Sequence, residues 1–124
     1  MSMGINKDTL IMELQSAITG FVIDPEWIPD NLGYLIINDL ARYMCDQAFL
    51  SDWEELKKGM DFLERSLEGG DSYMRDLVHE CLETFLSCDH VGEIKKYFGP
   101  QTLELWNQFM DETYQRRVRD RNLH

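Results

Sequence analysis

The sequence predicts an all-α fold of five to six helices, arranged as packed antiparallel helical hairpins in a single domain over residues 1–124. Three observations support this prediction. Apolar residues recur at spacings of three and four along most of the chain, which is typical of helices with one buried face. No stretch alternates apolar and polar residues over a convincing length, as a half-buried strand would. Glycine, proline and capping residues separate the helical stretches, and the chain is long enough for one core.

The first helix is expected at about 7–19, where the apolar repeat consists of Leu10, Ile11, Leu14, Ile18 and Phe21. After Gly20, the prolines Pro25 and Pro29 exclude a continuous helix. The apolar residues between them nevertheless predict an ordered connection rather than a solvated loop. A second helix is expected at about 31–48, with an inward face made of Leu32, Leu35, Ile36, Leu40, Tyr43 and Met44.

The clearest helix start is Ser51-Asp52-Trp53-Glu54. In this pattern the Ser51 hydroxyl accepts from the backbone N–H of Glu54, and the Glu54 carboxylate reaches back to the N–H of Ser51. The helix that follows should end at Gly69-Gly70, because glycine tolerates the left-handed conformation. Its expected buried stripe is Trp53, Leu56, Met60, Leu63 and Leu67.

Asp71 is predicted to cap a helix at about 72–87, antiparallel to the preceding one because the connection is short. Its expected buried stripe is Met74, Leu77, Val78, Cys81 and Phe85.

Asp89 is predicted to cap a short helix at 90–98. Gly99-Pro100 then separates it from a last helix, which runs from 100 to about 118 and buries Leu103, Trp106, Phe109 and Met110. Residues 116–124 are expected to form a frayed basic tail. Six large residues are expected to be largely buried: Trp53, Leu56, Leu63, Leu77, Phe85 and Trp106.

The chain is strongly acidic, with 23 Asp and Glu residues against 12 Lys and Arg and a formal charge of −11. Because four arginines lie in the last ten residues, residues 1–114 carry about −14. This charge disfavours nucleic acid as a ligand, since phosphate binding needs a basic surface. It favours a basic partner, whose encounter with the protein it would accelerate.

Carboxylates gather on the outer faces of the third and fourth expected helices. A helical wheel places Asp61, Glu64 and Glu68 within about 60° of one another, away from the apolar stripe. The same construction groups Asp76, Glu80 and Glu83 on the next helix, together with His79. Two interpretations remain open: ordinary solvated faces, or a contiguous acidic surface that binds a basic partner.

Two aromatic residues are also ambiguous. Phe62 falls with Gly59 and Ser66 on a second side of its helix, which fits either a helix buried on two sides or an exposed interface anchor. Trp27 lies among Asp24, Glu26 and Asp30. This composition suits contact with a basic surface, but a loop tryptophan can also fold onto the core.

No motif indicates an enzyme, a metal site or a cofactor. His79-Glu80-Cys81-Leu82-Glu83 is not the His-Glu-x-x-His pattern of zinc proteases, and the three cysteines lack metal-ligand spacing. The paired carboxylates face outward, without the desolvation that raises a catalytic pKa. The sequence has no signal-peptide pattern and no apolar run that could span a membrane, which predicts a cytoplasmic protein.

Part of the chain, residues 34–102, resembles a known group of proteins. The resemblance lies in Asp61-Phe62-Leu63-Glu64, Gly70-Asp71, Leu77-Val78, Cys81-Leu82-Glu83 and Phe98-Gly99-Pro100-Gln101-Thr102. These segments are similar to those of small helical bacterial proteins encoded beside polymorphic toxins, namely the immunity proteins of contact-dependent growth inhibition and related systems. The resemblance implies a non-enzymatic inhibitor that binds a cognate toxin C-terminal domain, commonly a nuclease, in the cytoplasm. It implies no catalytic residues.

Charge and resemblance together predict an immunity protein that neutralises a basic toxin domain. The partner-binding residues expected for it are Asp61, Glu64, Glu68, Asp76, Glu80, Glu83, Asp24, Glu26, Trp27 and Asp30. The alternative is an acidic helical adaptor or structural protein without a toxin partner. The oligomeric state does not follow from the sequence.

Overall fold

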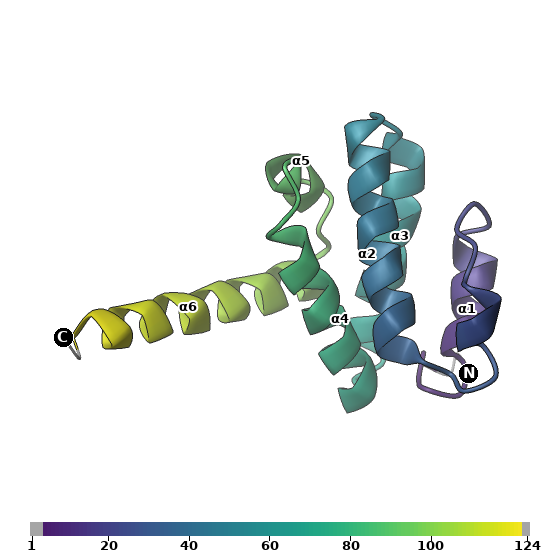
Figure 1. Cartoon of the computed structure of the whole chain (residues 1–124), viewed down its shortest axis with the longest axis horizontal. Helices are drawn as coiled ribbons and strands as arrows, with labels where there is room; N and C mark the ends of the chain where they lie inside the picture. Colours follow the sequence, from purple (N-terminus) through teal and green to yellow (C-terminus); the bar gives the residue numbers. More distant parts are fainter. Residues whose placement is uncertain (1–3, 123–124) are drawn as a thin grey trace.

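The computed structural model describes residues 4–122 and confirms the all-α prediction (Figure 1). The described residues form helices and turns, without a strand. The elements are α1 (Leu10–Ala17), the 3₁₀ turn η1 (Pro25–Trp27), α2 (Gly33–Phe49), α3 (Trp53–Glu68), α4 (Ser72–Phe85), α5 (Val91–Lys95) and α6 (Pro100–Asn122).

The helices α2, α3 and α4 form the centre of the molecule. Each of the three packs against the other two, and the remaining helices cover them: α1 lies against α3, α5 against α2, and α6 against α3 and α4. Figure 1 shows α1 on one side of this centre, while α6 begins beside α4 and then extends away from the other helices. Residues on the outer sides of α2, α4 and α6 are among those left exposed.

The core confirms most of the expected large buried residues. Leu56, Leu63, Leu77, Phe85 and Trp106 are buried. Trp53 is the exception, because it is only partly buried. Its ring stacks on that of Tyr97 with 5.9 Å between centroids.

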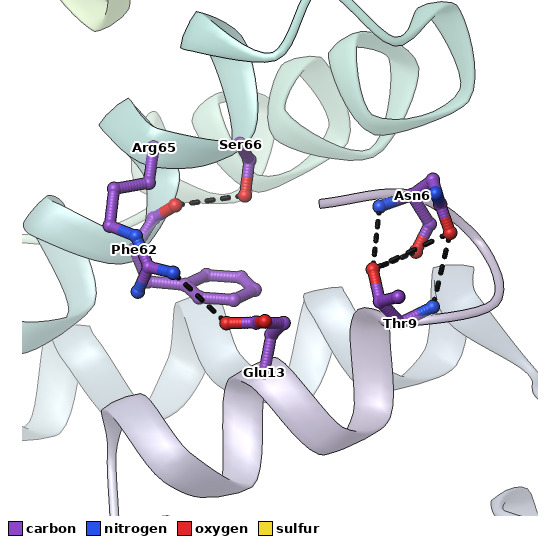
Figure 2. A network of polar contacts seen from close by, with 6 residues as sticks. All are labelled: Asn6, Thr9, Glu13, Phe62, Arg65 and Ser66. Carbon is purple, nitrogen blue, oxygen red and sulfur yellow. Dashed lines mark hydrogen bonds and ion pairs between the residues drawn. The ribbon is translucent and has the colours of Figure 1, made fainter. Parts of the chain in front are cut away.

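Helix α3 is buried on two sides. Phe62, Gly59 and Ser66 are all buried, so the first of the two interpretations of Phe62 is the right one. Figure 2 shows Phe62 pointing from α3 toward α1. Across the same contact, Arg65 Nη2 lies 2.9 Å from Glu13 Oε2. Within α3, the Ser66 hydroxyl donates to the carbonyl oxygen of Phe62. This half-exposed ion pair contributes at most about 1 kcal/mol, so apolar burial holds α1 in place.

The predicted capping box at Ser51 is wrong by one residue. Ser51 has a φ of 59° and ends α2, with its N–H donating to Ala48 O while the N–H of Asp52 donates to Gln47 O. These two bonds are those of a Schellman motif, whose left-handed residue cannot also adopt the extended conformation of an N-cap. Asp52 takes that role instead and accepts from Glu55 N at 3.2 Å.

Of the other predicted helix starts, that of α4 is confirmed, and those of α5 and α1 are wrong. Asp71 caps α4 as predicted, by accepting from Met74 N at 2.9 Å, and Gly70 follows α3 with a φ of 70°. Asp89 does not cap α5, because His90 holds that position without a side-chain bond. Helix α1 begins at Leu10 rather than 7, since the Asn6 side chain accepts from Asp8 N and Thr9 N in a preceding turn (Figure 2 draws the Thr9 bond).

Two of the expected buried stripes are wrong in part. On α6, Leu103 and Met110 are each 38% exposed, whereas Thr102 and Leu105 are buried beside Trp106. For α2, Leu35 and the preceding Leu32 are exposed, and Ile37 and Ala41 are buried instead. Helix α6 also continues to Asn122, beyond the expected end at 118, and residues 123–124 of the expected tail lie outside the described residues.

Candidate protein-binding surface

An open groove of about 700 Å³ runs between α2 and α4. The outer side of α2 provides one wall, and α4 with the turn after it provides the other. The lining residues are Asn38, Arg42, Cys45 and Asp46 from α2, and Glu80, Glu83, Thr84, Ser87 and Cys88 from the opposite wall. The residues from α2 recur at helical spacing, so they share one face of that helix.

The Thr84 hydroxyl links the two walls of the groove. The Thr84 hydroxyl lies 3.1 Å from Asn38 Oδ1 and 3.2 Å from the carbonyl oxygen of Glu80. Beneath this polar layer, α2 and α4 bury Leu40, Met44 and Cys81. The groove is therefore a shallow polar surface above a packed helical pair, suited to a partner's side chains rather than to an enclosed small molecule.

The groove is acidic. Asp46, Glu80 and Glu83 contribute carboxylates, and Arg42 is the only guanidinium among the lining residues. Arg42 forms no ion pair with another residue of the part of the chain that the structure describes. Glu83 Oε1 lies 3.6 Å from His79 Nδ1, which compensates its charge only when the histidine is protonated. The excess of acceptors favours a partner that brings basic groups.

The predicted carboxylates of α4 fall into two places. Glu80 and Glu83 line the groove with α2, whereas Asp76 lines a smaller hollow of about 140 Å³ between α4 and α6. In that hollow Arg75 donates to Gln108 Oε1 at 2.8 Å, and the His79 ring meets the Phe109 ring edge-on. The exposed side of α4 therefore separates the α2–α4 groove from the hollow between α4 and α6.

The predicted carboxylates of α3 differ from one another. Asp61 and Glu68 are exposed and remain candidates. Glu64 has a structural task, because its carboxylate accepts from Gln101 N, Thr102 N and the Thr102 hydroxyl at 2.8–2.9 Å. It faces the start of α6, while Glu80 and Glu83 face α2.

The residues predicted around Trp27 belong to η1 and its flanks. Asp24 caps this turn by accepting from Glu26 N at 2.9 Å, and Trp27 is half-buried against the core. Glu26 and Asp30 are exposed. Asp30 also lines a hollow of about 380 Å³ whose apolar part is formed by Leu32, Tyr34, Leu35 and Tyr73.

Several residues of these surfaces were not among the partner-binding residues predicted from the sequence. Arg42 and Asp46 complete the α2 wall, and their spacing from Asn38 on a polar helix face was a usable signal. Phe49 and Leu50, exposed by 72% and 66%, lie at the end of α2, and Tyr34 and Leu35 lie exposed at its start. Only Leu35 belongs to the inward face expected from periodicity, and the apolar repeat gave no role to Tyr34, Phe49 or Leu50.

Comparison with known proteins identifies a family. The model of the family described as "Domain of unknown function (DUF7674)" matches residues 10–115. The chain belongs to this family. No curated protein and no solved structure matches it significantly.

The region shared with the DUF7674 family begins at the first residue of α1 and ends within α6. It therefore includes both walls of the α2–α4 groove and the contact of Glu64 with α6. Within residues 4–122, no three His, Cys, Asp or Glu side chains are grouped so that they could hold a metal ion. No helix among those residues is both long and apolar enough to cross a membrane.

Proposed function

We propose that this protein is an immunity protein, a non-enzymatic inhibitor that binds the C-terminal domain of a cognate bacterial toxin in the cytoplasm. The partner is a basic domain, of which a nuclease is the best-fitting class. A nuclease must present a basic cleft to nucleic acid, and a strongly acidic protein can occupy that cleft.

The acidic α2–α4 groove is the observation that carries this proposal. Asp46, Glu80 and Glu83 surround a concavity large enough to take several side chains of a partner. Basic side chains entering it would meet carboxylates on both walls. Phe49 is exposed at the C-terminal end of α2, three residues after Asp46. It can add apolar contact area, because aromatic residues dominate the binding energy of many interfaces.

The proposal has a direct test in the gene neighbourhood and in binding. The gene immediately upstream should encode a larger secreted toxin, and its C-terminal domain should copurify with this protein when both are produced together. The complex should protect cells from the toxin domain. A toxin domain that remains free and active in the presence of this protein would overturn the proposal.

An acidic helical adaptor is the second candidate function. The exposed apolar residues at both ends of α2 favour it, because Tyr34, Leu35, Phe49 and Leu50 could support assembly through apolar surface. Such an adaptor would bind its partner with little dependence on salt, and its gene would have no toxin gene beside it. Salt dependence therefore discriminates between the two functions.

A further inference from the structure

Two of the three cysteines meet in the α2–α4 groove. Cys45 lies on α2 and Cys88 lies in the turn after α4, and both are half-buried free thiols that line the groove. Cys81, the third, is fully buried beneath it on α4. The pairing of Cys45 with Cys88 is produced by the packing of α2 on α4, since the two residues are far apart in the sequence.

The two groove thiols line the same concavity, on elements that pack against each other. Burial raises the pKa of the Cys45 thiol, and the neighbouring Cys88 thiol raises it further. Burial also raises the pKa of Cys81, with a smaller contribution from nearby Cys45. A disulfide requires that the two sulfur atoms meet, and the packing of α2 on α4 places both thiols on the same groove.

We infer that Cys45 and Cys88 form a reversible intramolecular disulfide when the protein meets a peroxide. This bond would join the end of α2 to the turn after α4 across the groove. Disulfides of this kind in reducing compartments are usually transient and respond to oxidants. The inference does not depend on the identity of the binding partner.

The reaction balances with hydrogen peroxide as the oxidant. The Cys88 thiolate attacks one peroxide oxygen, which breaks the O–O bond and gives a sulfenic acid and, after protonation, one water. The Cys45 sulfur then attacks the sulfenic sulfur, loses its proton and releases a second water. Cys45 is the second reactant because its raised pKa keeps it protonated, and the thiolate is the reactive form. A dithiol reductant reverses the reaction by exchange.

The experiment treats the full-length reduced protein with a small excess of hydrogen peroxide, unfolds it and alkylates the remaining thiols. Of the three thiols, two should escape alkylation, the mass should fall by two hydrogens, and a dithiol reductant should restore both. Peptide mapping without reduction should find Cys45 linked to Cys88. Three alkylated thiols, a bond that involves Cys81, or a bond between two molecules would each overturn the inference.

Matched variants sharpen this test. Cys45→Ser and Cys88→Ser should each abolish the internal bond, while Cys81→Ala should keep it. Helicity measured by circular dichroism would identify a variant that fails to fold. The peptide map of the unaltered protein decides the question even if every variant is unstable.

Discussion

At the scale of single residues, the carboxylate of Glu64 joins α3 to α6. Its three acceptor contacts, with Gln101 N, Thr102 N and the Thr102 hydroxyl, satisfy donors at the start of α6 that have no partner within the helix. A negative charge at a helix N-terminus also interacts favourably with the helix dipole. Glu64 therefore does for α6 what an N-cap side chain does for other helices, but from a neighbouring helix.

Gly99 makes this contact possible. A Cβ atom at Gly99 would lie 2.5 Å from Glu64 Cδ, so an alanine would displace the carboxylate. We expect Glu64→Ala to lower the free energy of unfolding by about 2–3 kcal/mol, since hydrogen bonds to charged groups are the stronger ones. Gly99→Ala alone should cost about 1–2 kcal/mol by weakening the same bonds. Urea unfolding of each variant measures these values.

The combined variant distinguishes this mechanism from a general loss of packing. Once Glu64 is replaced by alanine, Gly99→Ala has no carboxylate to displace and should be neutral, or stabilising by up to about 1 kcal/mol. A double-mutant cycle therefore should give a coupling energy of about 1–3 kcal/mol. Additive effects of the two substitutions would contradict the proposed contact.

Tyr43 gives the folded protein a dependence on alkaline pH. Burial, followed by the hydrogen bond and the negative charge of Glu55, raises the pKa of Tyr43 from 10.0 to about 12. The folded state holds the proton more tightly than the unfolded state, so this contribution to stability is fully present below about pH 10. It is lost as the pH rises through about 12.

The measurement is the free energy of unfolding of wild type and Tyr43→Phe at several pH values. At neutral pH the variant should be less stable by about 1 kcal/mol, because it lacks the bond to Glu55. Between pH 10 and 12 it should lose less stability than the wild type, so that the two curves converge. Since Tyr73 remains in both proteins, its own raised pKa cancels in the comparison. Parallel curves would show that Tyr43 titrates normally.

At the scale of secondary-structure elements, two leucines of α6 that lie two residues apart test the orientation of this helix. Leu105 is 5% exposed, whereas Leu103 is 38% exposed. We expect Leu105→Ala to destabilise the protein by about 2–4 kcal/mol through lost burial and a cavity. Leu103→Ala, the same chemical change two residues away, should cost less than about 1 kcal/mol. Thermal or urea unfolding of the two variants measures these costs. A larger cost for Leu103→Ala than for Leu105→Ala would show that Leu103 is buried, as periodicity predicts.

The orientation of α6 illustrates what periodicity can and cannot predict. Three-four spacing placed all six helices, because each has a buried face and a recognisable end at glycine, proline or a capping residue. It could not predict that Glu64 draws Thr102 inward, which turns Leu103 toward solvent. It also could not predict that Ser51 ends one helix rather than beginning the next, since both roles depend on backbone conformation.

At the scale of the whole molecule, the candidate site depends on how distant elements meet. The carboxylates of α4 could be found on a helical wheel, but the groove that holds Glu80 and Glu83 requires α2 beside α4. The α3 carboxylates looked equivalent on the wheel, and only the position of α6 separates Glu64 from Asp61 and Glu68. Charge reversal at Glu64 is therefore an unsuitable test of binding, because it would also weaken the fold.

The last prediction concerns the rate at which a basic toxin domain associates with the groove. The double reversal of Glu80 and Glu83 to Lys should slow association by roughly tenfold or more, because charges around a binding site act mainly on diffusional encounter. Stopped-flow or surface-based kinetics measure this rate. A matched control is the double reversal of Glu104 and Asp111, exposed carboxylates on α6, which changes the net charge equally but leaves the groove intact.

Salt provides the second arm of the same experiment. Raising the ionic strength from about 50 mM to about 500 mM shortens the Debye length from roughly 14 Å to roughly 4 Å. Wild-type association should then slow toward the rate of the groove variant, whose own rate should change much less. If both double variants slow association equally, net charge rather than the groove attracts the partner. If neither reversal nor salt changes the association rate, binding through acidic residues is excluded. The surface around Trp27 and Asp30 then becomes the better candidate. Asp30 lines an exposed apolar hollow there, and apolar contacts are insensitive to screening by salt.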